Sequence, residues 1–176
     1  MKGKGVLSHD AGMENIDIRR FTAVDRDWLI KQHEVHYAQA EGFDASFGVL
    51  VAVILDDFLA CHDPQCEAGW IAWDGDLRLG SIFCVHLTAE TAKLRLFLLV
   101  PEARGKRLGR RMLETCMGFA RDVGYRDMQL WTHESHRAAG ALYAQNGWHL
   151  VRSEPVVSFG QPNVEQHWEI TLSLRP

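Results

Sequence analysis

Long apolar runs are missing from this sequence, since none approaches the roughly 20 consecutive apolar residues that a membrane span requires. An excess of basic residues is missing too. Nineteen lysines and arginines stand against 23 aspartates and glutamates, so the formal net charge is −4. That charge does not suit a chain that coats nucleic acid or an anionic membrane. We therefore expect neither a nucleic acid nor a membrane among the partners.

Cysteine is scarce, and its spacing does not suit a metal. Cys61 and Cys66 lie on either side of His62, but no second pair of ligands follows at the spacing of a zinc site. Cys84 and Cys116 occupy apolar positions, where a free thiol behaves as a small hydrophobic side chain. The sequence therefore predicts no metal and a reduced, cytoplasmic protein.

Internal repeats, low-complexity tracts and linkers are also missing. A chain of 176 residues then predicts one domain that is large enough to bury a real core. Residues 1–15 contain Lys2 and Lys4 but no apolar segment after them, so we expect a flexible tail and no secretory signal. The domain itself is expected over residues 16–176.

Residues 92–123 are the most informative stretch. Ala92–Val100 is a short apolar run that ends at Pro101, as a buried strand does. A basic loop follows it, and from Leu108 apolar residues recur at helical spacing until Gly124. The first turn of a helix has unpaired N–H groups and about half a positive charge. This loop therefore predicts an anion-binding site.

Two well-known glycine motifs do not describe the loop. A P-loop requires Gly-Lys followed by Ser or Thr, and a dinucleotide fingerprint requires Gly-x-Gly-x-x-Gly. Here Gly105 and Gly109 are four residues apart in a segment rich in arginine. Neither motif fits.

Residues 104–109, Arg-Gly-Lys-Arg-Leu-Gly, resemble Arg/Gln-x-x-Gly-x-Gly/Ala, the pyrophosphate loop of the GNAT superfamily of acyl-CoA-dependent N-acetyltransferases. The segment departs from that pattern at Arg107, which can still offer its backbone N–H if its φ is negative. Residues 138–148 resemble the same family's Ala-x-x-Leu-Tyr-x-x-x-Gly-Phe stretch, with Trp148 in place of phenylalanine. His136 stands where the family usually has asparagine.

The predicted elements follow the order of the GNAT fold, β-α-α-β-β-β-α-β-α-β-β, over residues 16–174. We expect an α/β (α+β) protein with a mixed, mostly antiparallel central sheet of about six to seven strands and about four flanking helices. Thr22 is expected to cap the first helix, and Ser153–Val164, with Pro155, Gly160 and Pro162, is expected to be a loop between the last two strands. The domain is also similar to the acetyltransferase half of proteins in which it is fused to a winged-helix repressor. The sequence contains no repressor half.

The resemblance implies that acetyl-CoA is the co-substrate and that its acetyl group passes directly to a primary amine of a small molecule or peptide in a ternary complex. The pantetheine arm would lie where two central strands part, against backbone groups at the end of the fourth strand, and the basic loop would bind the pyrophosphate. The implied cofactor-binding residues are Leu98, Leu99, Val100, Arg104, Gly105, Lys106, Arg107, Leu108, Gly109, Arg110, His136 and Ala139.

Tyr143 matches the family's general acid by position and type, and it would protonate the departing thiolate. The base stays open, because residues 93–100 contain no glutamate of the kind that many relatives carry there. Histidine titrates near pH 6.5, which suits a base at neutral pH. The candidates are His133 and Glu134 after the fifth strand, His33 and His36 in the first helix, and a chain of waters.

Tyr37, Glu41, Phe43 and Phe47 combine aromatic and acidic character that suits a cationic or aromatic amine acceptor, although helix packing also accounts for the two phenylalanines. A second reading is a catalytically silent acyl-CoA-binding module that acts as a sensor or interaction domain. Arg107 and the missing strand glutamate favour that reading, whereas the segment around Tyr143 favours the enzyme. A homodimer is common in the family and is compatible with the late strands.

Overall fold

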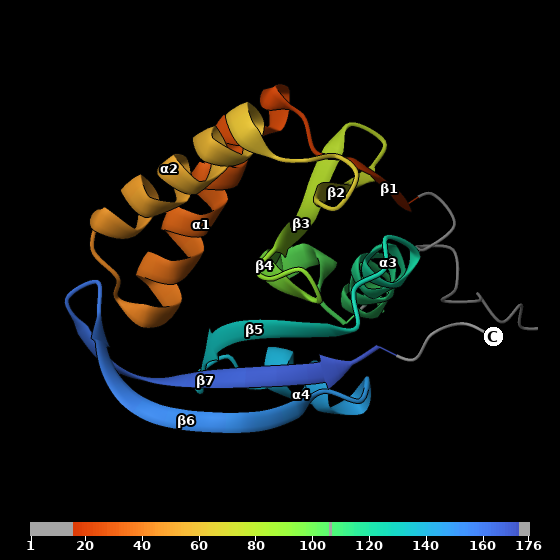
Figure 1. The fold of residues 1–176 in the computed structure, drawn as a ribbon. Coiled ribbons are helices and arrows are strands. Elements are labelled where there is room, and N and C mark those ends of the chain that lie inside the picture. Colours follow the sequence, from red (N-terminus) through yellow and green to blue (C-terminus); the bar gives the residue numbers. More distant parts are fainter. Residues whose placement is uncertain (1–15, 106, 173–176) are drawn as a thin grey trace, which may run out of the picture.

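The central feature of the computed structural model is a mixed sheet with the strand order β1-β2-β3-β4-β5-β7-β6. The structure describes residues 16–105 and 107–172, and over these residues seven strands and four α-helices follow the predicted order (Figure 1). The bounds are β1 Ile16–Arg20, α1 Arg26–Glu41, α2 Ser46–Cys61, β2 Ala68–Asp74, β3 Leu77–His86, β4 Thr91–Leu99, α3 Leu108–Asp122, β5 Asp127–His133, α4 Arg137–Gln145, β6 His149–Ser158 and β7 Gln161–Thr171, with short 3₁₀ turns η1 at Ala23–Asp25 and η2 at Pro101–Ala103.

Helix boundaries agree with the predicted stop signals more closely than with the start signals. Gly42 and Gly124 follow α1 and α3 at φ 68° and 98°, in the left-handed conformation that ends a helix. Thr22 precedes η1, and α1 begins only at Arg26 because the short turn comes between them. Among the described residues, no helix combines the length and apolar character needed to cross a membrane.

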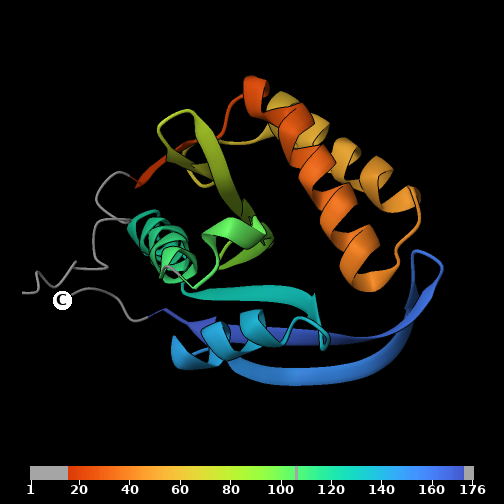
Figure 2. The ribbon, with the colours of Figure 1, turned by 180° about the vertical axis from the view of Figure 1, so that it is seen from behind.

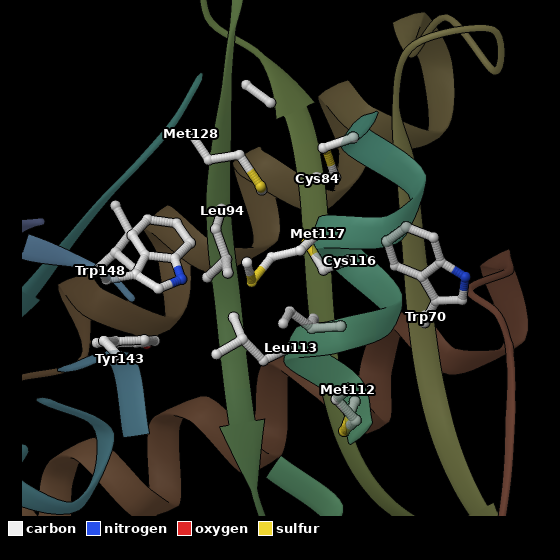
Figure 3. Packing of buried hydrophobic residues seen from close by; sticks show 14 of the residues in the cluster. Trp70, Cys84, Leu94, Met112, Leu113, Cys116, Met117, Met128, Tyr143 and Trp148 are labelled. Carbon is white, nitrogen blue, oxygen red and sulfur yellow. The ribbon is translucent and has the colours of Figure 1, made fainter. Parts of the chain in front are cut away.

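The two faces of the first half of the sheet bury different side chains, because successive residues of a strand point to opposite sides. On one face α3 packs Met112, Leu113 and Cys116 against Trp70 and Leu94 (Figure 3). The other face is covered by α1 and α2, as Figure 2 shows. Full burial of a leucine or methionine side chain contributes about 1.5–3 kcal/mol, so the amphipathic pattern that predicts α3 also fixes its position on the sheet.

The sheet opens between β4 and β5. These two strands are parallel, and their pairing is limited to Thr91–Lys93 against Asp127–Gln129. Beyond that point β4 continues to Leu99 beside β3 alone, with a bulge at Leu96, whose φ is 50°. Ser81 supports the bulge by donating a hydrogen bond from Oγ to the Leu96 carbonyl at 2.6 Å. The outer edge of the second half of β4 is therefore unpaired in the described sheet, which splits between β4 and β5.

The predicted loop over Ser153–Val164 is wrong, because β6 and β7 form one long hairpin that turns at Phe159 and Gly160. Pro155 and Pro162 both lie within its ladder. Proline is tolerated on a strand edge that needs no N–H donor. β6 is an edge strand, and β7 pairs with β5 only from Glu165 onward, so both prolines have a free side.

Candidate active site

The basic loop joins the end of β4 to the start of α3. Gly105 and Arg107 both adopt the left-handed conformation, with φ of 75° and 55°. The condition of a negative φ at Arg107 is therefore not met, and arginine here takes the left-handed shape at the position where the family pattern has glycine. A left-handed conformation costs a non-glycine residue roughly 1–2 kcal/mol. Lys106 lies outside the described residues.

Gly109 lets the first turn of α3 approach two other elements closely. A Cβ atom at this position would lie 3.3 Å from Leu142 Cδ2 in α4 and 3.3 Å from Leu99 Cδ1 in β4. The neighbouring arginines, Arg104 and Arg110, are exposed, and Arg110 Nε pairs with Glu114 in its own helix at 2.8 Å. The first turn of α3 therefore lies against the end of β4 at the split, with guanidinium groups beside it.

The end of β4 presents its backbone to the split. The Val100 N–H donates to the Leu79 carbonyl at 2.9 Å, on the β3 side. Backbone groups alternate in direction along an antiparallel strand, so those of Leu99 point the other way, toward the split. Of the three residues predicted to bind pantetheine through their backbones, Leu99 is the one whose N–H and C=O this alternation leaves available.

Tyr143 lies in α4 among apolar rings. It is 4% exposed and packs against Phe97, Trp148 and Trp168, with ring centroids 5.9–6.4 Å apart. Burial raises the pKa of Tyr143 far above its ordinary value. The hydroxyl therefore keeps its proton throughout the physiological pH range, as a proton donor requires. Ala139, one turn earlier in the same helix, is partly buried against this core.

A polar cluster lies at the other end of α4. His136 immediately precedes the helix, and its Nε2 is 2.8 Å from Glu41 Oε1, at the end of α1. Ser135 donates from Oγ to Glu41 at 2.7 Å, and Asn163 donates from Nδ2 at 3.2 Å. Burial raises the pKa of Glu41, but these hydrogen bonds and the neighbouring histidines outweigh it, so the pKa is below its ordinary value. Glu41 is an anion held by donors from two segments, the β5–α4 connection and β7.

The candidate bases lie in different places. His133 is half-buried beside this cluster, and burial together with His136 lowers its pKa. Glu134 is exposed, and its backbone N–H donates to Val164. His33 belongs to the core, where Nδ1 lies 2.9 Å from the Leu29 carbonyl and burial lowers its pKa to about 4. His36 lies on a partly buried face of α1, and its Nε2 is 3.2 Å from Oε1 of Gln32.

Aromatic rings line the side of the cluster that faces α1 and α2. Tyr37 and Phe47 have centroids 4.4 Å apart, and Phe43 and Phe159 have centroids 4.9 Å apart. Tyr37 also lies 5.1 Å from the His136 ring. Phe159 and Asn163 come from the β6–β7 hairpin, in the segment predicted to be a loop, and no sequence signal indicates their place in the site.

The cluster also contains ligand types that zinc prefers. Glu41, His133 and His136 each offer one ligand atom, and these atoms lie within 4.8 Å of one another. However, Ser135 and Asn163 already donate to the Glu41 carboxylate. A second group of possible metal ligands consists of Glu154, Glu165 and His167. The guanidinium of Arg152 lies against this group, with Nη2 3.1 Å from Glu154 Oε1 and 3.3 Å from His167 Nε2, where a metal ion would otherwise sit.

Comparison with known proteins agrees with this arrangement. The model of the Acetyltransferase (GNAT) family matches residues 21–148. Mycothiol acetyltransferase of Geodermatophilus obscurus is 31% identical over 85 residues. These residues cover 45% of this chain and 28% of the relative, so the match extends over less than a third of that protein's length.

Several solved structures share the fold at low sequence identity. Spermidine N-acetyltransferase of Vibrio cholerae, in complex with CoA and spermine, superposes with a TM-score of 0.71 at 14% identity and covers 91% of this chain and 97% of its own. The protein yncA of Salmonella typhimurium, with its cofactor acetyl-CoA, gives 0.70 at 16% identity over 92% and 96% of the two chains. The ribosomal-protein-alanine N-acetyltransferase of Escherichia coli gives 0.71 at 14% identity, also over 92% and 96%.

Proposed function

The chain belongs to the acetyltransferase (GNAT) family, and from this premise we propose that it is an acetyl-CoA-dependent N-acetyltransferase. It transfers the acetyl group to a primary amine of a small molecule or peptide by direct attack in a ternary complex. The observation that carries the proposal is the split between β4 and β5, with the first turn of α3 at one end and Tyr143 beside it. Two structural relatives are N-acetyltransferases of amine acceptors by name.

Binding of acetyl-CoA divides between two parts of the split. The pyrophosphate lies at the N-terminus of α3, where unpaired N–H groups and Arg104 attract negative charge. The pantetheine arm lies along the outer edge of β4 and bonds to the backbone of Leu99. Gly109 is the residue that lets these two parts meet, since a larger side chain would occupy the space between Leu99 and Leu142.

Chemistry at the thioester requires one group that stabilises negative charge and one that donates a proton. A backbone N–H at the end of β4 polarises the carbonyl, a contribution worth about 3 kcal/mol where such donors have been removed. Tyr143 then protonates the sulfur as the C–S bond breaks. Its raised pKa keeps the proton available at every pH at which the enzyme would work.

Location and assembly are further parts of the proposal. The four cysteines of the described chain are free thiols, which suits a reducing compartment such as the cytoplasm. The edge strand β6 exposes Leu150 and Val151, which supports a homodimer through this edge, and sedimentation velocity tests it. The similarity to repressor fusions remains a prediction from the sequence and supports no DNA-binding role.

The test has two stages. Calorimetry measures acetyl-CoA binding, and a thiol-release assay then screens primary amines, including polyamines, arylalkylamines and short peptides. We expect binding, release of free CoA with at least one amine, and a large loss of turnover without loss of binding in Tyr143→Phe. Binding with no release for any amine, in wild type and variant alike, would support the silent acyl-CoA sensor. Absence of binding would contradict both.

A further inference from the structure

Glu41 and His136 make a paired contact that no sequence motif indicates. The two residues are far apart in the chain, yet Nε2 of His136 lies 2.8 Å from Oε1 of Glu41. The side chain of Glu41 is 7% exposed and that of His136 is 22% exposed. The pair is therefore shielded from water, with the imidazole on the more open side.

The contact determines which ring nitrogen carries hydrogen. An ionised carboxylate has only lone pairs, so a nitrogen 2.8 Å away from it must carry the hydrogen between them. Ser135 and Asn163 donate to the same carboxylate and keep its oxygens in place. In a neutral imidazole only one nitrogen is protonated, and Nδ1 of His136 is then left with its lone pair.

The surroundings also determine the charge of the imidazole. Burial lowers the pKa of His136, and the Arg104 guanidinium lowers it further, while Glu41 raises it. The titratable groups near the ring are Glu41 and Tyr37 from α1, His133 from β5 and Arg104 from the basic loop. Tyr37 is itself protonated at neutral pH, because burial raises its pKa to about 12. His136 is therefore neutral at pH 7, with a free lone pair.

His136 lies on the helix that carries Tyr143, about two turns before it, or roughly 10 Å along the axis. It is the N-terminal cap of α4, and its ring lies 5.1 Å from that of Tyr37 in the aromatic wall that faces α1. His133 belongs to the same cluster, with its ring centroid 6.0 Å from that of His136 and 5.5 Å from that of Phe43, but the 2.8 Å contact with Glu41 is made by His136.

We propose that His136 is the base that deprotonates the acceptor amine and that Glu41 is a positioning residue that holds its ring and stabilises its protonated form. The inference rests on the proposed function and adds the identity of the base. A carboxylate behind an imidazole plays this part in the serine-protease triad, where it fixes the tautomer and stabilises the imidazolium.

The proton balance closes without another reactant. An alkylammonium gives one proton to Nδ1, and the freed nitrogen lone pair forms a C–N bond to the thioester carbon. The C–S bond breaks, and the sulfur takes the hydroxyl proton of Tyr143. The tyrosinate then takes the surplus proton of the new amide nitrogen. The products are an amide, a free thiol and one proton on His136, which passes to solvent.

The first test does not depend on any amine. With ¹⁵N-histidine labelling of the full chain, the ring signals of His136 are assigned by their absence from His136→Gln. We expect a neutral ring that carries hydrogen on Nε2 at pH 7. A neutral ring with hydrogen on Nδ1, or an imidazolium at that pH, would overturn the inference. So would one equivalent of zinc that survives gel filtration of wild type but not of His136→Gln.

The second test uses the amine that gives the highest turnover in the screen. His136→Gln should lower kcat roughly 100-fold or more at pH 7, and the remaining rate should rise about tenfold per pH unit toward the pKa of the amine. The affinity for acetyl-CoA should change less than about threefold. His86→Gln, an exposed histidine at the end of β3, should leave both quantities unchanged.

The role of Glu41 has its own readout. Because Glu41 raises the pKa of His136, Glu41→Gln should lower kcat and move the acidic limb of the pH profile to lower pH. A purely structural role would lower the rate without moving the limb. An acidic limb that does not move in Glu41→Gln would overturn the inference. It would also be overturned if His136→Gln lost as much acetyl-CoA affinity as rate, because His136 would then be a cofactor ligand only. Failure of the whole screen would contradict the proposed function, whereas the tautomer measurement would still test the pair.

Discussion

Arg78 donates a hydrogen bond from Nε to Oδ1 of Asp25 at 2.8 Å, across 53 residues of sequence. The carboxylate is 3% exposed, and its other oxygen accepts from the backbone N–H of Thr22 at 3.0 Å. The pair ties the turn before α1 to the start of β3. It therefore helps to fix the direction in which α1 crosses the sheet and carries Glu41 to the site.

Removal of one partner should expose the cost of leaving the other without a charge partner. We expect Asp25→Ala to lower the free energy of unfolding by about 2–4 kcal/mol in urea denaturation. Asp17→Ala is the matched control, because its pair with Arg19 is exposed and should contribute less than about 1 kcal/mol. Equal effects of the two substitutions would show that burial of the Asp25 pair is energetically unimportant.

The left-handed conformation of Arg107 gives a prediction about the loop. The free energy of unfolding of Arg107→Gly should be about 1 kcal/mol higher than that of Arg107→Ala, because only glycine adopts this φ without steric cost. Both variants lose the same charge, so their difference in acetyl-CoA affinity isolates the backbone shape. Indistinguishable melting curves would contradict the strain at this residue.

The close approach at Gly109 makes it the most sensitive position for cofactor binding. Gly109→Glu should weaken acetyl-CoA binding at least tenfold by calorimetry, because it adds bulk and negative charge beside the phosphates. Arg104→Ala should weaken binding by less. Gly118→Ala, in the same helix with open space around it, should leave affinity unchanged. Unchanged affinity in both Gly109→Glu and Arg104→Ala would mean that the pyrophosphate binds elsewhere.

His33 should make the fold sensitive to acid. Burial lowers its pKa from 6.5 to about 4, so below pH 6.5 the unfolded chain binds a proton that the folded chain does not. Stability is then lost as the pH falls from 6.5 toward 4, by up to roughly 3 kcal/mol. His33→Phe keeps an aromatic ring beside Tyr37 but does not titrate. On acidification the urea midpoint of wild type should therefore fall further than the midpoint of this variant. An equal fall of the two urea midpoints between pH 7 and pH 4.5 would contradict this reasoning.

Periodicity predicted those parts of the molecule that local chemistry determines. The helix from Leu108 was readable because a buried stripe repeats along it, and Gly42 and Gly124 mark helix ends because few other residues adopt their φ. The hairpin of β6 and β7 was not readable. Two prolines and a glycine within twelve residues indicate a loop unless the strands around them have free edges, and this depends on the neighbours of each strand.

The candidate site also has one part that the sequence predicts and one part that it does not. The basic loop and Tyr143 lie in contiguous motifs, so both could be recognised from the sequence. The pair of Glu41 and His136 could not, because it joins residues on different elements, and the donor Asn163 comes from the segment that was expected to be a loop. The φ of Arg107 was also beyond reach, since the sequence alone favours the commoner negative value.

The short ladder between β4 and β5 also bears on the stability of the domain. Among the residues that the structure describes, three pairs join the two halves of the sheet at this seam, so a molecule lying along it would bridge both halves and act as an additional strand. Saturation with such a molecule at 100 times its Kd would add about 2.7 kcal/mol to the free energy of unfolding. The coenzyme would thus be part of the architecture of the domain as well as a reactant.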